Sequence, residues 1–133
     1  MHLLEPSPDI MSEVIEELQI SLDKAVRLKV SRDRIILDPG IGFGKNHQEN
    51  LLLLNRLPQL AELGFPLLVG TSRKRFIGAV LDRPVTERLS GTIASSVVAI
   101  LNGAHILRVH DVAEMKEAAE VVDSITLEKL TRC

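Results

Sequence analysis

Hydrophobic residues recur at helical spacing near the start of the chain. The positions are Val14, Ile15, Leu18, Leu22, Ala25 and Val26. Intervals of three and four residues predict an amphipathic helix, and either Asp9 or Ser12 is suited to cap its start. A second helical pattern runs from about residue 47 to residue 63. Pro58 lies inside this pattern and is expected to kink or split the helix, because proline removes a backbone donor.

Three apolar runs are too short for helices and predict strands. They are "RIILD" (34–38), "PLLVGTSR" (66–73) and "HILRVH" (105–110). Helical patterns separate and follow them, over 47–63, 76–81, 87–102 and from residue 111 onward. Asp111 and Glu114 have the spacing of a capping box at the start of the last helix. Its predicted buried stripe is Val112, Met115, Ala119, Val122 and Ile125.

The order of these elements predicts a parallel sheet. A strand followed by a helix, repeated along the chain, is typical of right-handed crossovers between parallel strands. Each unit takes about 35 residues, and eight such units, about 250 to 280 residues, would close a (β/α)8 barrel. Only three units are found here. The pattern therefore leaves two folds open: a small open sheet, or the later part of a longer barrel.

Composition narrows the classes of partner. Sixteen Lys and Arg against eighteen Asp and Glu give a net charge of −2, and three Phe are the only aromatic residues. This composition argues against nucleic acid binding, which needs basic surface or stacking rings. The single cysteine, Cys133, allows no internal disulfide and fits a reducing cytoplasm. No apolar stretch approaches the roughly 20 residues that span a bilayer, so no membrane partner is expected.

The stretch "ILDPGIGFGK" (36–45) places Asp38 at the end of the first predicted strand. It is not a Walker loop, because Pro39 stands where that motif needs glycine and Asn46 where it needs Ser or Thr. Ligands of α/β proteins bind at the carboxyl ends of the strands. A carboxylate there can accept two N–H bonds from the edge of a pterin or guanine. The alternative is that Asp38 caps the turn before Pro39.

Two clusters of polar residues follow the other strands. The turn after the second strand contains Ser72, Arg73, Lys74 and Arg75. Its cations, its hydroxyl and the free N–H groups of the next helix suit a carboxylate or phosphate, and the alternative is a solvated basic turn. After the third strand, Arg108 and His110 project to the same side and suit a pyrophosphate. The alternative for His110 is a packing role.

The remaining histidines give no metal site. No two of them have the i, i+4 spacing of a helical metal site, so no metal centre built by the protein is predicted. His47 is expected to open a helix, and His105 to start the third strand at the opposite end from the ligand. Glu87 and Arg88 are expected to form a structural ion pair at a helix start.

Four motifs occur in one order: "ILDPGIGFGK", "LLVGTSRKRFIG", "ERLSGT" and "GAHILRVHDV". Together they resemble the C-terminal half of bacterial dihydropteroate synthases, the folate-pathway family targeted by sulfonamides, from about residue 12 onward. The resemblance implies that residues 1–133 are the C-terminal half-barrel of a pterin-binding domain. This is an α/β fold, a partial TIM (β/α)8 barrel of about strands six to eight with their helices plus one preceding helix. Residues 1–2 also resemble the family's "MHMQG", from which the following "LLEPSP" departs.

The family condenses 6-hydroxymethyl-7,8-dihydropterin pyrophosphate with p-aminobenzoate and releases 7,8-dihydropteroate and pyrophosphate. The resemblance therefore implies a cytoplasmic transferase with two small-molecule substrates. By resemblance, Asp38, Lys74 and Arg108 would bind the pterin. Arg108 and His110 would bind the pyrophosphate, and Lys74, Arg108 and His110 would be the catalytic residues.

The second substrate and the metal follow from the same resemblance. Phe43, Ser72 and Arg75 would line the p-aminobenzoate pocket. Mg²⁺ would arrive on the substrate's pyrophosphate, with its protein ligand outside this chain. The isolated chain is expected to be inactive, because the other half of the family's site has no counterpart here. It is also expected to form a homo-oligomer, because strands without neighbours leave unpaired edges.

Two other functions stay open at this stage. One is the pterin-binding domain of a folate-dependent methyltransferase, although "SRKRFIG" and "RVHD" favour the synthase because the methyltransferase holds no pyrophosphate. The other is a non-catalytic remnant that binds a ligand or a partner chain.

Overall fold

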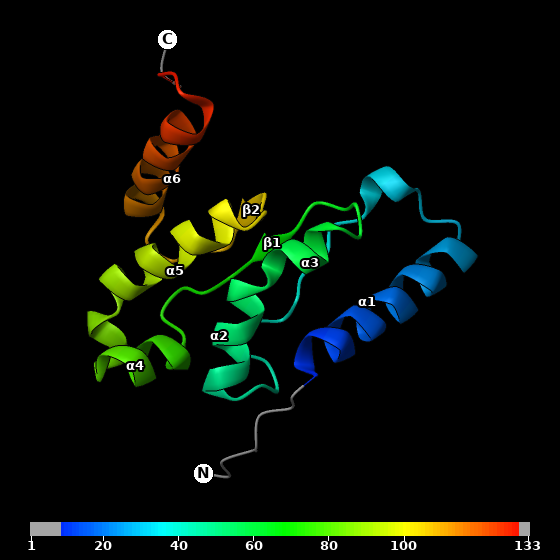
Figure 1. The fold of residues 1–133 in the computed structure, drawn as a ribbon, viewed down its shortest axis with the longest axis horizontal. Coiled ribbons are helices and arrows are strands. Elements are labelled where there is room, and N and C mark those ends of the chain that lie inside the picture. Colours follow the sequence, from blue (N-terminus) through cyan, green and yellow to red (C-terminus); the bar gives the residue numbers. More distant parts are fainter. Residues whose placement is uncertain (1–8, 131–133) are drawn as a thin grey trace.

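The computed structural model describes residues 9–130, which form helices around a very small parallel sheet (Figure 1). The likeness of residues 1–2 to the family motif and the terminal Cys133 lie outside the described part. In chain order the elements are α1 (Ile10–Arg27), the 3-10 helix η1 (Arg32–Arg34), α2 (His47–Asn55), α3 (Leu57–Ala61), β1 (Leu68–Val69), α4 (Arg75–Leu81), the 3-10 helix η2 (Val85–Glu87), α5 (Leu89–Leu101), β2 (Ile106–Leu107) and α6 (Val112–Leu127).

Three consecutive chain segments pair in parallel. Strand β1 pairs with β2, in the register Leu68 opposite Ile106 and Val69 opposite Leu107. On the other side of β1, Leu37 forms an isolated parallel bridge with Leu67. The predicted strand–helix order and parallel pairing are therefore confirmed.

The first predicted strand is wrong in extent, because only Leu37 of residues 34–38 pairs. The N–H of Leu37 donates to the carbonyl oxygen of Pro66 at 2.9 Å, and the N–H of Leu68 donates to that of Leu37 at 2.8 Å. Pro39, two residues on, has no N–H with which to continue this ladder. On the N-terminal side, residues 32–34 turn into η1 instead of extending.

The helices agree with the periodic patterns in most places. Pro58 splits the second pattern into α2 and α3, as expected, and takes a position in the first turn of α3 where its missing N–H costs nothing. His47 opens α2. The predicted buried stripe of α6 is only partly correct. Met115 and Val122 are buried, whereas Val112 and Ile125 are 64% and 69% exposed.

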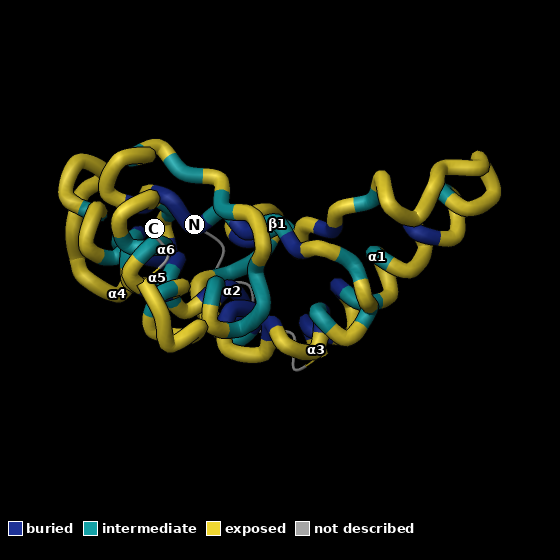
Figure 2. The backbone as a smooth tube through the Cα atoms, turned by 90° about the horizontal axis from the view of Figure 1, so that it is seen from above, coloured by how far each residue is buried: buried dark blue, intermediate teal, exposed yellow. Residues whose placement is uncertain are grey.

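The core lies between the helices and the strands in the middle of the molecule. Helix α5 packs against α6 and α2, and α1 packs against α2. Figure 2 shows the buried segments gathered along β1, α2 and α3, while α4 and the far end of α1 are mostly exposed. Leu53, Leu57, Leu60 and Leu67 at its centre have no exposed surface. Helices α1 and α6 lie at opposite ends of the arrangement (Figure 1).

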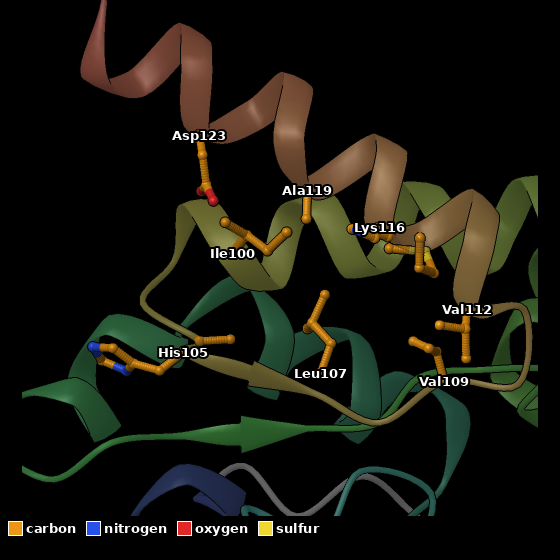
Figure 3. A pocket seen from close by; sticks show the side chains of 10 residues that line it. Ile100, His105, Leu107, Val109, Val112, Lys116, Ala119 and Asp123 are labelled. Atoms are coloured by element: carbon orange, nitrogen blue, oxygen red, sulfur yellow. The ribbon is translucent and has the colours of Figure 1, made fainter. Parts of the chain in front are cut away.

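A groove of about 300 Å³ lies between α6, α5 and the segment that contains β2 (Figure 3). Its walls are mainly apolar, from Ile100, Leu107, Val109 and Met115, with charged groups on α6. It contains none of the residues that the sequence assigned to a ligand site. No helix within residues 9–130 is long and apolar enough to cross a membrane.

Candidate functional site

The predicted ligand-binding side chains follow the carboxyl ends of the three paired segments. Asp38 comes directly after Leu37, the turn that begins at Gly70 follows β1, and Arg108 comes directly after β2. Because the three segments are parallel, these ends meet at one edge of the sheet. The fold thus brings together residues that are far apart in the sequence.

Asp38 is exposed at this edge, and one of its oxygens closes the following turn. Its Oδ1 accepts the N–H of Gly40 at 2.8 Å. The turn-capping interpretation is therefore correct for that oxygen. Asp38 also lies close enough to Lys74 for its carboxylate to raise the pKa of the Lys74 amine. The carboxylate therefore belongs to the electrostatic environment of the edge as well as to the turn.

The glycine-rich loop after Asp38 is held by two polar side chains. Asn50, which is 3% exposed, accepts the N–H of Gly42 through Oδ1 at 2.8 Å. Lys45 Nζ donates to the carbonyl oxygens of Gly40 at 2.9 Å and Phe43 at 3.0 Å. Helix α2 then starts with a reciprocal capping box formed by Asn46 and Glu49. The loop is thus fixed to the first turn of the helix that follows it.

Lys74 crosses this loop from the next turn along the chain. Its Nζ donates to the carbonyl oxygen of Ile41 and lies 5.0 Å from the centre of the Phe43 ring. Burial lowers the pKa of Lys74 below its ordinary value of 10.5; the Asp38 carboxylate raises it, and the cations Arg108 and Lys45 lower it. Burial and three charged neighbours therefore act on the Lys74 amine at this edge.

Gly42 makes the crossing of Lys74 possible. Its φ is +86°, and a Cβ built on it would lie 2.9 Å from Lys74 Cδ. Such a separation is about an ångström inside ordinary carbon–carbon contact. A side chain at position 42 would therefore push Lys74 off the loop.

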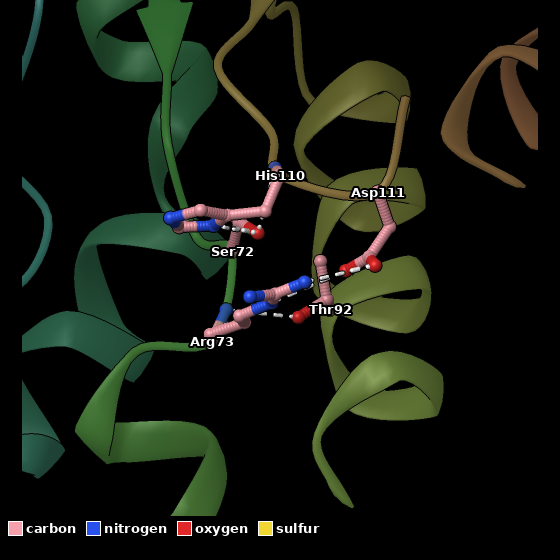
Figure 4. A network of polar contacts seen from close by, with 5 residues as sticks. All are labelled: Ser72, Arg73, Thr92, His110 and Asp111. Carbon is pink, nitrogen blue, oxygen red and sulfur yellow. Dashed lines mark hydrogen bonds and ion pairs between the residues drawn. The ribbon is translucent and has the colours of Figure 1, made fainter. Parts of the chain in front are cut away.

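Ser72 and His110 form a polar pair between the second and third strand ends (Figure 4). Ser72 Oγ shares a hydrogen bond with His110 Nδ1 at 2.7 Å, and it accepts the backbone N–H of His110 at 3.2 Å. Ser72 is 7% exposed. His110 is exposed, so the packing alternative is not supported, although one ring nitrogen is already hydrogen-bonded.

Arg73, next to Ser72, has a left-handed backbone with φ of 58°. For a residue other than glycine this conformation costs about 1–2 kcal/mol. It persists here because several groups hold it. The Arg73 N–H donates to Thr92 Oγ1 at 3.0 Å, and its guanidinium pairs with Asp111 at 3.0 Å. The alternative of a solvated basic turn is therefore only partly realised, because the guanidinium of Arg73 pairs with Asp111.

Two sequence-based assignments near this turn are wrong. The Asp111 side chain makes no capping bond at the start of α6, because its carboxylate faces Arg73 instead. Glu87 and Arg88 form no ion pair within residues 9–130. Arg88 donates from NH1 to the carbonyl oxygen of Arg73 at 3.0 Å and from Nε to that of Arg83 at 3.1 Å.

The other predicted site residues lie as follows. The Arg108 side chain is exposed beside Gly70, with its Cβ 3.5 Å from where a Cβ of Gly70 would be. Phe43 is 67% exposed on the loop. Arg75 opens α4 and is exposed, and no hydrogen bond within the described residues joins it to the other site residues. His105 lies away from this edge, where Nδ1 accepts the N–H of Leu67 at 3.3 Å.

Sequence reasoning missed the supporting residues Asn50 and Thr92, and it missed the pairing of Asp111 with Arg73. Asn50 and Thr92 stand inside helices, where polar residues are normally solvated. Their burial, 3% and 0% exposed, shows that they serve the loop and the turn packed against them. No local spacing in the sequence indicates such a partner, because it comes from another unit.

Comparison with known proteins places this geometry in a family. The profile of the family described as pterin binding enzyme matches residues 3–110. The chain belongs to the pterin-binding enzymes. The resemblance to dihydropteroate synthases that the four motifs indicated is confirmed by the relatives that match this chain, which are dihydropteroate synthases.

The pterin-binding enzymes similar to this chain are longer than it. Dihydropteroate synthase of Clostridium beijerinckii is 44% identical over 118 residues, which make up 88% of this chain and 44% of that protein. The solved Coxiella burnetii dihydropteroate synthase in complex with pteroic acid has a TM-score of 0.85 and 41% identity, covering 91% of this chain and 47% of that one. The Yersinia pestis enzyme with a sulfonamide drug complex has a TM-score of 0.90 and 38% identity, covering 96% and 47%. The chain thus spans less than half the length of these relatives.

Proposed function

We propose that this chain supplies the strand-six-to-eight part of a dihydropteroate synthase barrel. In that role it binds the pterin pyrophosphate and p-aminobenzoate that the enzyme condenses. The observation that carries the proposal is the meeting of Asp38, Lys74 and Arg108 at one sheet edge, in a chain 44% identical to a dihydropteroate synthase. The solved relatives hold pteroic acid or a sulfonamide, and the reported matches are synthases, which favours the synthase over the methyltransferase.

Each group at the edge has a distinct task in this proposal. The free acceptor capacity of Asp38 receives the N–H groups of the pterin's amino-pyrimidine edge. Lys74 leaves the Ile41 carbonyl and reaches the pterin ring, and Arg108 lies beside it. Arg108 and His110 bind the pyrophosphate. Phe43, Ser72 and Arg75 border the position of p-aminobenzoate, so the loop of residues 39–45 covers the substrates.

The chemistry follows from the weakness of an aromatic amine as a nucleophile. Loss of pyrophosphate from the pterin's methylene carbon must then run ahead of attack by the amine. Cations placed at the departing pyrophosphate stabilise the charge that develops there. The electron-rich pterin shares the positive charge left on the methylene carbon. The amine then bonds to that carbon and loses a proton, and no covalent enzyme intermediate forms.

Magnesium enters this proposal only as a companion of the substrate. Within residues 9–130 no group of three or more His, Cys, Asp or Glu residues is placed to hold a metal ion. No step that the proposal assigns to the described residues depends on the ion. The expectation that Mg²⁺ arrives on the pyrophosphate stays a proposal.

The barrel and the self-association are parts of the same proposal. Leu37 and β2 are the outer members of the small sheet, and the groove beside β2 is apolar (Figure 3). In a complete barrel, further strands would pair with the outer sides of the Leu37 segment and of β2, and further helices would cover them. In the isolated chain a second copy would cover part of them, giving a homo-oligomer with little or no turnover. Sedimentation equilibrium that shows a monomer at micromolar concentration would contradict the oligomer.

Isothermal calorimetry with 6-hydroxymethyldihydropterin pyrophosphate tests the binding. We expect measurable affinity for the chain and weaker affinity for the same pterin without pyrophosphate. Asp38→Asn removes a charge-assisted pair and should weaken binding by about tenfold to a hundredfold. Asp82→Asn, the same change at an exposed helix end, is the matched control and should leave affinity unchanged.

The alternatives give different results in this experiment. Equal affinity with and without the pyrophosphate would favour a methyltransferase-type pterin domain. Absence of binding by the unchanged chain would leave the non-catalytic remnant as the better description. An Asp38→Asn chain with full affinity would remove Asp38 from the pterin site.

A further inference from the structure

Two neighbouring cross-links join the turn after β1 to the turn after β2. Ser72 pairs with His110, as described above, and Arg73 pairs with Asp111 (Figure 4). The guanidinium donates through NH2 to Oδ1 at 3.0 Å and through Nε to Oδ2 at 3.4 Å. Since the partners are adjacent on both turns, one link fixes the orientation of the other.

The Arg73 backbone is fixed as well, from helix α5. Its N–H donates to Thr92 Oγ1, which belongs to a residue with no exposed surface, and its carbonyl oxygen accepts from Arg88 NH1 at 3.0 Å. The turn closes on itself through the N–H of Lys74, which donates to the carbonyl oxygen of Thr71 at 3.1 Å. Arg73 is therefore the point where the turn, α5 and the start of α6 are joined.

The residue type at position 73 is unusual for its backbone conformation. Glycine takes a positive φ without cost, whereas arginine does not. Stability does not account for the arginine either. The side chains of Arg73 and Asp111 are 44% and 23% exposed, and exposed ion pairs contribute little to folding. What arginine adds and glycine cannot is a directed, two-bond connection to Asp111.

We propose that Arg73 is a positioning residue for the site. By pairing with Asp111 it sets the β1–α4 turn against the β2–α6 turn. This places Ser72 and His110 in register and directs Lys74 toward the glycine-rich loop. Its guanidinium thus serves the geometry of the pyrophosphate end and does not itself bind substrate. The part of this inference that concerns the ligand rests on the proposed function, whereas the part that concerns the turns does not.

Nuclear magnetic resonance of the His110 imidazole nitrogens reports how the two turns are placed relative to each other, and it needs no ligand. We compare the unchanged chain with Arg73→Gly, Arg73→Met and Asp111→Asn. Arg83→Met is the matched control, because Arg83 is exposed and its side chain has no bond to Asp111. The three variants should shift the His110 Nδ1 resonance, and the control should not. Arg73→Lys, which keeps the charge, should restore the resonance in part.

Arg73→Gly separates positioning from backbone strain. Glycine relaxes the turn, so its unfolding midpoint should match or exceed that of the unchanged chain. Its affinity for 6-hydroxymethyldihydropterin pyrophosphate should nevertheless fall about tenfold, as it should for Asp111→Asn. If Arg73→Met fails to fold, Arg73→Gly and Asp111→Asn still decide the question.

The outcomes distinguish this inference from the proposed function. A His110 Nδ1 resonance that is unchanged in Arg73→Gly and Asp111→Asn overturns the positioning role, whatever the affinity. Shifted resonances with unchanged affinity overturn the claim that the position matters for the pyrophosphate. An unchanged chain that binds no pterin pyrophosphate refutes the proposed function, while the resonances still test the positioning of the turns.

Discussion

Replacing Gly42 by alanine tests how Lys74 is placed over the loop. Two contributions should lower the unfolding free energy of this variant. The first is the positive φ of 86°, which costs about 1–2 kcal/mol for a residue with a Cβ, less about 0.4–1 kcal/mol gained because alanine restricts the unfolded chain. The second is the overlap of the new Cβ with Lys74 Cδ. The stem of Lys74 is flexible, so this overlap should cost about 1 kcal/mol, the low end of overpacking.

Gly44→Ala provides a matched control within the same loop. Gly44 has a φ of +64°, and nothing lies within 4 Å of where its Cβ would be. It should therefore show the backbone cost alone, about 1 kcal/mol or less, whereas Gly42→Ala should cost about 2 kcal/mol. Urea unfolding followed by circular dichroism measures both values. In the double variant Gly42→Ala/Lys74→Ala, truncating Lys74 should reduce the excess cost, because alanine lacks the Cδ that the new Cβ would crowd.

The comparison between the two glycines decides the matter. Equal losses of unfolding free energy at positions 42 and 44 would refute the close approach of Lys74 to the loop. An excess at position 42 that persists in the double variant would assign the cost to another neighbour. Either result would also remove the geometric basis for a loop closed by Lys74.

Three further changes test other parts of the structure. Asn50→Ala removes the buried acceptor of the Gly42 N–H and should lower the unfolding free energy by about 2 kcal/mol in urea; no loss would contradict the loop anchor. Asp38→Asn removes the charge that raises the pKa of Lys74, so the titration midpoint of its Cε resonance should move further below 10.5, and a rise would contradict the contact. Gly91→Ala puts a Cβ 2.3 Å from Ile77 Cγ2. Crowding should outweigh the gain in helix propensity and destabilise the chain by about 1–2 kcal/mol. A stabilised chain would refute the close packing of α4 and α5.

The lowered pKa of Lys74 also makes the unfolding free energy depend on pH. Between that pKa and 10.5 the unfolded chain binds more protons at this residue than the folded chain does. The unfolding free energy of the unchanged chain should therefore rise with pH in this window, relative to Lys74→Met. Urea unfolding at several alkaline pH values measures the difference, and a falling difference would contradict the role of burial.

The elements were predictable from local patterns because each depends on nearby residues. The spacing of Val14 and Leu22 in α1 and the position of Pro58 before the break in α3 both act within a few residues. Strand length was not predictable in this way. Whether Ile36 or Leu37 pairs depends on which N–H groups the facing segment offers, and Pro39 and Pro66 together restrict that ladder to one bridge.

The candidate site could also be predicted only in part from the sequence. The strand-end positions of Asp38, Lys74 and Arg108 follow from the order of units, so their meeting at one edge was predictable. The choice of Asp111 for Arg73, in place of its own helix end, was not. A capping box and an ion pair compete for the same carboxylate, and only the distance between two turns decides which of them forms.

The links at the sheet edge also have a consequence for the order of folding. Ser72–His110 and Arg73–Asp111 each join residues 38 positions apart. Closing a loop of that length loses more chain entropy than forming a local helix, so these links should form late in folding. During synthesis the edge cannot be complete until His110 and Asp111 have left the ribosome. Nascent chains that end before His110 lack half of each link, so they cannot hold the two turns together.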